Sequence, residues 1–401
     1  MNWQNVRRIL KSDYLILLPV VALAFYIAFI PHLNYPYPVH LDEWTHLACS
    51  NQIIEQASVV GLTDPFSGGA PIENQELEVG FHLFWAIFHQ ISGISWLFIF
   101  RYFPSIIFII TVLSVYVLAQ RQGFGWQAAL FTCLITTTVG ILGPAFMVPV
   151  AMGLLFIPLS IFLVFNFRTV RSYLVLFIFM CFLLTLHGAT AVGLVIILIP
   201  YILLNLKGNF RHSLGITLAL AIPVGVSLPW IFDTLLPAAK SLFSPVPILP
   251  FVDIPQVIQT YGYLPILLGI LGTFLLAMKG TKESYGLVSG LLALLLMLTA
   301  FFTFHYGIPI VYYRGLVYVM LMMGIVGGAG LTGVKNLRLP AKLSTRLKVP
   351  LITRNMGNIL CLVLIGLTLY IAIPDRQNTS YYHMIDEEDY QAFTSTLVSL
   401  F

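Results

Sequence analysis

The densest group of chemically active side chains lies in residues 40–46 (HLDEWTH), where two adjacent carboxylates are flanked by imidazoles. A helix that begins near Asp42, just after His40, carries His46 on the same face as Asp42. Such a group can act as a general base, or hold a divalent cation such as Mg²⁺ or Mn²⁺ through Asp42, Glu43 and His46. The alternative is structural: Asp42 caps a helix and Glu43 sits in its first turn, where the helix dipole favours negative charge.

A second acidic cluster follows, in which Glu73, Glu76 and Glu78 precede His82. These side chains form a second candidate ligand set for a metal. The alternative interpretation is a solvated face of a loop. Asp64, in a Thr-Asp-Pro-Phe segment, is expected in a turn because Asp before Pro favours that conformation.

The composition then identifies the kind of protein that must position these groups. The 401 residues include only 20 basic and 16 acidic side chains, 59% are hydrophobic, and the mean hydropathy is +0.92. A soluble domain needs far more surface charge than this. The four cysteines have no metal-type spacing and predict no disulfide framework. The net charge of +4 is dispersed in short basic clusters, so it does not indicate nucleic-acid binding.

Apolar runs of about 20 residues predict an all-α, polytopic transmembrane bundle of about eleven helices. The first run is read as a retained helix. The run from 172 to 206 is expected to turn at His187, a helix-end residue, because one helix of that length would exceed the bilayer. Residues 79–92 are expected to form a helix at the membrane interface. The expected spans are 14–32, 96–119, 126–142, 144–167, 172–187, 188–206, 213–236, 263–279, 285–303, 313–333 and 357–374.

The basic residues predict the orientation of this bundle. With the N-terminus inside, 16 of the 20 lysines and arginines fall in cytoplasmic segments, as the positive-inside rule requires. The expected transmembrane domain is then 1–374. Extracytoplasmic segments are a first loop, 31–95, that carries short interfacial helices, a second loop, 237–262, and a C-terminal tail, 375–401, with a short surface helix. The expected location is a prokaryotic plasma membrane, with the acidic groups on the outer side.

An Asp42-Glu43 pair in a long first external loop resembles the GT-C superfamily of membrane glycosyltransferases. That superfamily includes protein O-mannosyltransferases, oligosaccharyltransferase catalytic subunits and the aminoarabinose transferases that act on lipid A. The resemblance extends to residues 80–86 (GFHLFWA), Gly93 and 100–105 (FRYFPS). These are similar to the family's pattern of an apolar helix, a glycine and an arginine-containing start of the next span.

A late motif, 312–314 (YYR), is similar to the arginine that these families place on a lipid-linked phosphate. By this resemblance Asp42 activates the acceptor or coordinates a metal, and Glu43 is its neighbour. Arg314 and Arg101 neutralise the phosphate of a polyprenyl-linked sugar donor. His305, in the same short external segment as Arg314, is expected to touch that phosphate or the sugar, and Tyr313 beside Arg314 is a further candidate site residue.

The resemblance implies a polyprenyl-phosphate-linked (dolichyl-type) donor, a lipid, glycan or protein acceptor, and surrounding membrane lipids as partners. The chain lacks the Trp-Trp-Asp-Tyr-Gly signature of oligosaccharyltransferases, and a large C-terminal globular domain is not expected. Both departures favour a single-sugar donor over a whole oligosaccharide.

Three other classes of protein are weighed against a glycosyltransferase. A lipid-linked glycan flippase or other transporter requires charged or broken helices at mid-membrane, whereas the acids here cluster in external loops. A polyprenyl-pyrophosphate-dependent polymerase or ligase typically has arginines in a large late loop, whereas the largest acidic loop here comes first. A membrane protease requires a nucleophile or zinc pair within the bilayer, and no such pair is visible in the sequence.

Overall fold

The computed structural model describes residues 13–64, 68, 70–71, 78–138, 140–241, 245, 254–338, 350–381 and 383–392. These residues form an all-α protein with one antiparallel hairpin of two short strands, β1 (Thr63–Asp64) and β2 (Ala70–Pro71). The helices before the middle of the chain are α2 (Asp13–Phe29), η1 (Ile30–His32), α3 (Leu41–Gln56), α4 (Val79–Ser92), α5 (Trp96–Gln120), α6 (Gly125–Thr132), α7 (Pro149–Asn166) and α8 (Val170–Leu186). The later ones are α9 (Gly188–Leu206), α10 (Phe210–Ser241), α11 (Ile254–Tyr261), α12 (Tyr263–Lys279), α13 (Lys282–Phe304), α14 (Pro309–Lys335) and α16 (Pro350–Gln377).

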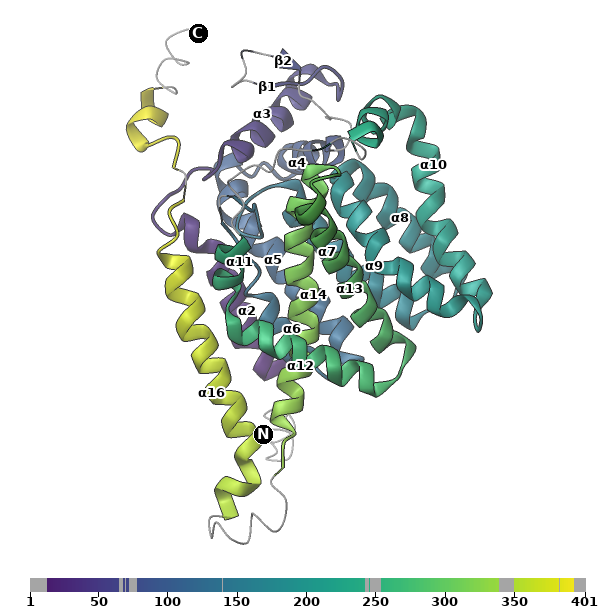
Figure 1. Cartoon of the computed structure of the whole chain (residues 1–401). Helices are drawn as coiled ribbons and strands as arrows, with labels where there is room; N and C mark the ends of the chain where they lie inside the picture. Colours follow the sequence, from purple (N-terminus) through teal and green to yellow (C-terminus); the bar gives the residue numbers. More distant parts are fainter. Residues whose placement is uncertain are drawn as a thin grey trace, which may run out of the picture.

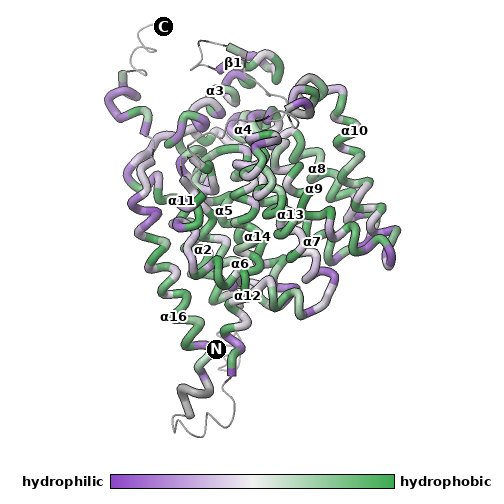
Figure 2. Tube along the Cα trace, viewed as in Figure 1, coloured by the Kyte–Doolittle hydropathy of each residue, from purple (hydrophilic) through white to green (hydrophobic). Residues whose placement is uncertain are grey.

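Among the described residues, eight helices are long and apolar enough to cross a membrane: α2, α5, α7, α9, α10, α13, α14 and α16. The pair α11 and α12, bent by 83° at their junction, makes a ninth if it is one broken span. Hydrophobic residues dominate along these helices, and hydrophilic residues gather at their ends (Figure 2). The expected all-α, polytopic membrane architecture is confirmed, and the chain is an integral membrane protein.

Two helices outside this set, α3 and α4, lie together at one end of the bundle (Figure 1). We call this the α3 end. The helix expected over 79–92 is present as α4 with these bounds. Its Phe81 and Trp85 are buried against the bundle, whereas Leu83 and Ile87 are exposed. The opposite end of the bundle carries the C-terminal end of α14, whose last residue is Lys335. The start of α6 lies there too, because the Nζ of Lys335 is 5.4 Å from the centroid of the Trp126 ring.

The expected span over 126–142 is wrong in length, because α6 ends at Thr132. The sequence explains the break: three consecutive β-branched threonines, at 136–138, are followed by Gly140, Gly143 and Pro144, which disfavour a helix. The chain then continues without helix to Val148, and α7 begins at Pro149 rather than at 144. Non-helical backbone at membrane depth is tolerated only where protein covers it. The described residues from Cys133 to Val148 are indeed almost all buried.

Arg376, near the end of α16, satisfies part of this interrupted backbone. Its side chain is only 1% exposed, and its guanidinium donates hydrogen bonds to the carbonyl oxygens of Ile135, at 2.9 Å, and of Leu134. These carbonyls follow the end of α6, where a helix leaves its last C=O groups without intrahelical partners. The contact therefore joins the last span to the break in α6.

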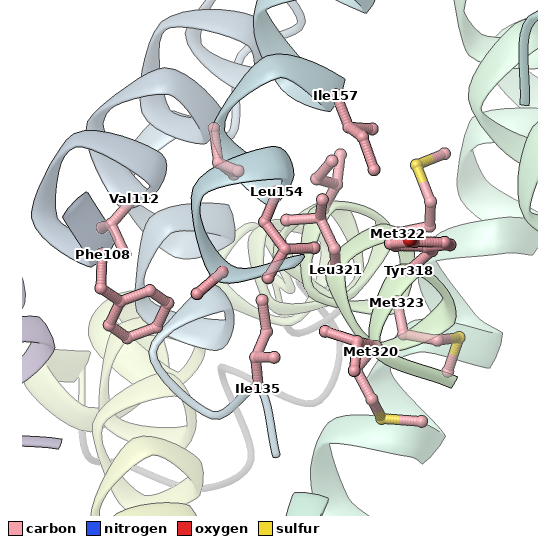
Figure 3. Close-up of a cluster of buried hydrophobic side chains, with 14 of the residues drawn as sticks. Phe108, Val112, Ile135, Leu154, Ile157, Tyr318, Met320, Leu321, Met322 and Met323 are labelled. Carbon is pink, nitrogen blue, oxygen red and sulfur yellow. The ribbon is translucent and has the colours of Figure 1, made fainter. Parts of the chain in front are cut away.

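The helix α14 forms the centre of the bundle, and nearly all its residues between Gly315 and Leu331 are buried. Small residues let its neighbours approach closely, as is common between membrane helices. A β-carbon on Gly272 of α12 would lie 1.8 Å from the carbonyl oxygen of Val326. In the core, Ile135, Leu154 of α7 and Leu321 of α14 belong to one cluster of buried side chains (Figure 3).

We expect Arg376→Met to lower the free energy of unfolding by about 1–3 kcal/mol, because two buried carbonyl oxygens lose their donor. Arg338→Met is the matched control, since Arg338 is exposed. Thermal unfolding of the two purified variants in the same detergent measures the difference. Equal midpoints for both variants would contradict the role given to Arg376.

Candidate active site

A cleft of about 320 Å³ opens at the α3 end of the bundle, where α3, α4, α7 and α14 meet. Six ionisable side chains line this cleft, and each was expected from the sequence in a motif, a turn or a helix end. Its polar lining consists of Asp42, Thr45, His46, Asp64, Glu78, His187 and Arg314. Apolar walls come from Leu41, Val148, Pro149, Val150 and Ile310. The cleft thus combines carboxylates, imidazoles and one guanidinium with apolar side chains.

Glu43 lies behind the cleft and fixes the start of α3. Its Oε2 accepts hydrogen bonds from the backbone N–H groups of Val39, at 2.7 Å, and His40, at 3.1 Å. Its Oε1 accepts one from the N–H of Met147, at 2.6 Å. Burial raises the pKa of Glu43 to about 7, although these three donors act in the opposite direction. The side chain of Glu43 is fully buried and does not line the cleft. Its contacts hold the backbone at the start of α3 in position.

Asp42 points into the cleft from the same helical turn. The N-cap of α3 is His40, whose Nδ1 accepts the N–H of Asp42 at 3.1 Å, so the capping role considered for Asp42 belongs to His40. Burial raises the pKa of Asp42, but the hydrogen bond and charge of His40, with His46 and Arg314, lower it below its usual value overall. Asp42 is therefore ionised at neutral pH and can accept a proton.

His46 and His82 form a buried pair that joins α3 to α4. Nδ1 of His46 lies 2.9 Å from Nε2 of His82, within hydrogen-bonding distance. Burial lowers the pKa of His46 to about 4, against the raising effect of the nearby Asp42 charge. His46 thus lines the cleft as a neutral imidazole, and His82 supports it from outside the cleft lining.

Glu78 reaches the cleft from the start of α4 and faces Arg314 and Asp42. Burial raises its pKa to about 7; the Arg314 charge lowers the pKa and the Asp42 charge raises it further. The other two glutamates of the expected cluster, Glu73 and Glu76, lie outside the described residues. Asp64, in β1, also lines the cleft. The sequence indicated only a turn at this residue.

His187 is a cleft residue that the sequence does not single out beyond its place at a helix end. It is the N-cap of α9, and its Nδ1 accepts the N–H of Thr190 at 3.2 Å. Thr190 Oγ1 lies 2.8 Å from the hydroxyl oxygen of Tyr318, one helical turn after Arg314 in α14. This chain of polar contacts fixes α9 against α14 directly beside the arginine. A neutral His187 with an accepting Nδ1 carries its proton on Nε2.

The other candidates from the sequence lie away from the cleft lining. Arg101 in α5 stacks on Tyr102, 5.4 Å from the ring centroid, and donates to the carbonyl oxygen of His32 at 3.4 Å. His305 is the exposed C-cap of α13. Tyr313 is buried, with its ring 6.3 Å from that of Phe301. Of the three residues expected on a donor phosphate, only Arg314 lines the cleft.

The C-terminal segment holds the chain that leads into α3. Tyr35 donates a hydrogen bond to the carbonyl oxygen of Ile385 at 2.6 Å, and its ring stacks on His383 with 4.0 Å between centroids. Tyr37 donates to Glu387. The expected surface helix of the tail is present as a short helix over 387–392. The tail therefore fixes residues only a few positions before Asp42.

A divalent cation was expected at Asp42, Glu43 and His46, but Glu43 is occupied by three backbone donors. Within the described ranges, no three His, Cys, Asp or Glu side chains are grouped so that they could hold a metal ion by themselves. Asp64, Asp42 and Glu78 all line the cleft, and the charges of the two residues Asp42 and Glu78 interact. Mg²⁺ is commonly held by one or two carboxylates together with substrate phosphates and water. These two residues fit such a site, and a fully protein-built site is not present among the described residues.

No protein-family model matches the chain, and no curated protein matches it by sequence. Its fold is similar to that of the apo oligosaccharyltransferase of Archaeoglobus fulgidus, with a TM-score of 0.63 and 12% sequence identity. The match covers 94% of this chain and 57% of that protein, so the chain spans little more than half of its length. This likeness confirms the GT-C-like fold that the sequence resemblance implies.

The different surroundings of the two adjacent acids predict unequal effects on stability when each is replaced by its amide. Glu43→Gln is expected to lower the free energy of unfolding by about 1–3 kcal/mol, because an amide NH₂ would then face a buried N–H donor. Asp42→Asn, on the open side of the same turn, is expected to change it by less than about 0.5 kcal/mol. Thermal unfolding in detergent compares the two. A larger loss from Asp42→Asn than from Glu43→Gln would reverse the assignment.

Proposed function

We propose that this protein is a glycosyltransferase that moves a sugar from a polyprenyl-phosphate donor to an acceptor at the extracytoplasmic face of a prokaryotic plasma membrane. The observation that carries the proposal is the cleft itself: an ionised carboxylate from α3 and a guanidinium from α14 face one cavity at the end of an apolar bundle. The GT-C-like fold supports this reaction class. A lipid-linked donor also explains why the cleft is built on membrane-spanning helices.

The reaction would be a displacement at the anomeric carbon of the sugar. Asp42 accepts the proton of the acceptor hydroxyl as that oxygen forms its bond to the anomeric carbon. The bond from the anomeric carbon to the phosphate oxygen breaks, and its electron pair leaves with the polyprenyl phosphate. Arg314 matches the phosphate oxygens with paired N–H donors and stabilises the charge that develops on them.

The remaining cleft residues would orient the sugar. His46 is neutral and partly held by His82, so it can exchange hydrogen bonds with sugar hydroxyls without adding charge. His187 offers the N–H of its Nε2 from the start of α9, since its Nδ1 is occupied by Thr190. The apolar stretch from Val148 to Val150 and Ile310 can cover the first carbons of the lipid next to the phosphate.

The distribution of basic residues supports the extracytoplasmic placement of the cleft. Arg314 stands at the cleft end of α14, and Lys335 stands at the other end. Of the basic residues that the structure describes, Arg121, Arg168, Lys207 and Lys279 lie at the ends of α5, α7, α9 and α12 that are away from the cleft. The positive-inside rule assigns such an end to the cytoplasm. This distribution supports a cleft that opens on the extracytoplasmic side.

The central test is sugar transfer by the purified protein in lipid, with a radiolabelled polyprenyl-phosphate hexose as the donor. Asp42→Asn is expected to reduce the rate by at least about 100-fold, because the amide cannot accept the proton. Arg314→Gln is expected to cost a similar factor through loss of phosphate stabilisation. Arg101→Gln and His305→Gln are the matched controls, since both residues lie off the cleft lining.

Full activity in Asp42→Asn would remove the base from this scheme. A loss in Arg101→Gln equal to that in Arg314→Gln would move the donor phosphate away from the cleft. A wild-type protein that binds these donors without turnover would favour a carrier of lipid-linked sugars instead.

We further propose a divalent cation, Mg²⁺ or Mn²⁺, held by Asp42 and Glu78 together with the donor phosphate. When bound, it would neutralise charge on the phosphate. Chelation with EDTA is then expected to abolish sugar transfer, and added Mg²⁺ or Mn²⁺ to restore it. Glu78→Gln is expected to raise the cation concentration needed for half-maximal rate by about tenfold, the factor for about 1.4 kcal/mol of lost binding. Transfer that persists at full rate after chelation would exclude this part of the proposal.

A further inference from the structure

A second cavity, a groove of about 560 Å³, lies between α16 and the bundle, against α2, α6 and α14. Most of its lining is aliphatic, including Val20 and Leu23 of α2, Leu130 of α6, and Leu362 and Leu369 of α16. In Figure 1, α16 runs along one side of the molecule. The groove therefore lies on the flank of the bundle that faces lipid, away from the cleft.

The length of the groove matches one leaflet of a bilayer. Its lining on α16 extends from Asn358 to Leu369, a rise of about 16 Å at ~1.5 Å per residue. Half of a hydrocarbon core of ~30 Å is about 15 Å. One acyl chain of a membrane lipid that lies along α16 would therefore fill the groove from end to end.

The groove is polar at one end only. Lys335 and Asn358 line it there beside Trp126, and Lys335 is the last residue of α14, at the end of the bundle opposite the cleft. Within the part of the chain that the structure describes, Lys335 has a cation–π contact with Trp126 and no carboxylate within ion-pair distance. A tryptophan and a lysine at the end of an apolar stretch are typical of the headgroup level of a membrane.

The sequence around this end is strongly basic. Between 335 and 354 there are six lysines and arginines and no acidic residue. Basic clusters that directly follow a membrane helix attract anionic lipids. Lys335 therefore provides a charge that distinguishes among lipid headgroups, whereas the aliphatic wall alone would accept any acyl chain.

We propose that this groove binds an anionic glycerophospholipid of the leaflet opposite the cleft, with one acyl chain against α16 and the phosphate at Lys335. A zwitterionic lipid would add its own cation beside Lys335. An anionic headgroup brings only negative charge, which Lys335 attracts. The site is distinct from the donor site, because Arg314 and Lys335 stand at opposite ends of α14.

Such a lipid would also hold α16 in place. Only 22% of the residues in the α16 span are buried, compared with 89% in α14, so protein contacts alone cover little of this helix. The same helix carries Arg376, which bonds the backbone beyond α6, and leads to the segment that holds Tyr35. A filled groove therefore stabilises elements that reach the cleft, and removal of the lipid is expected to lower thermal stability.

The test uses the full chain, reconstituted in bilayers of equal parts phosphatidylglycerol and phosphatidylcholine and then extracted in mild detergent. Native mass spectrometry counts the lipid that stays bound. Wild type and Lys335→Arg are expected to retain one phosphatidylglycerol in preference to phosphatidylcholine. Lys335→Gln is expected to reduce this preference about fivefold, the factor for loss of one lysine near a membrane surface.

Two further variants make the result specific to the groove. Ile365→Trp fills its middle and is expected to abolish retention of both lipids. Lys279→Gln removes a lysine that bonds Gln122 outside the groove lining, and is expected to leave retention unchanged. Equal retention of both lipids by wild type overturns the proposal. So does unchanged preference in Lys335→Gln, or preferential retention of an added polyprenyl phosphate. Because lipid retention is counted without turnover, the result is independent of the proposed sugar transfer.

Discussion

The geometry of the cleft depends on one buried carboxylate. Glu43 accepts three backbone N–H groups, two from the chain that enters α3 and one from Met147, 104 residues further along. A buried carboxylate is costly unless such donors compensate it, so its position is tightly determined. Neighbouring residues of a helix point about 100° apart, since a turn contains 3.6 residues. With Glu43 fixed inward, Asp42 must turn toward the cleft.

The donor from Met147 is available because the described residues between α6 and α7 are not helical. Met147 precedes α7, so its N–H has no partner within a helix and donates to Glu43 instead. The break leaves carbonyl groups that need partners in a membrane protein, and Arg376 supplies two hydrogen bonds. The segment around Ala145 and Phe146 is buried, so protein also shields the remaining backbone polar groups of the break from lipid. The irregular segment is therefore part of how the bundle builds its cleft.

Much of the bundle could be predicted because apolar length is a local property. The spans that became α7, α9, α13 and α14 were expected within a few residues of their observed bounds at most ends. The interruption after α6 was not expected, because residues 126–142 are apolar enough for a span, and the local preferences of threonine, glycine and proline decide its structure. Hydropathy does not distinguish a helix from a buried irregular segment.

The cleft was predictable in part for a similar reason. Asp42, His46, Glu78 and Arg314 were expected at the same end of the bundle from the count of spans, and they line one cleft. The burial of Glu43 and the position of His187 depend on contacts with Met147 and Tyr318, which are far away in sequence. Arg101 was assigned by resemblance and His305 by its place near Arg314 in the sequence. In the structure Arg101 stacks on an aromatic ring and His305 is exposed.

The most direct test of this account is a cryo-electron microscopy structure with a non-hydrolysable polyprenyl-phosphate sugar bound. We expect the phosphate to contact Arg314 and the anomeric carbon to face the Asp42 carboxylate, while Glu43 keeps its three backbone donors. A donor bound with its phosphate on Arg101, or with its sugar turned away from Asp42, would contradict it.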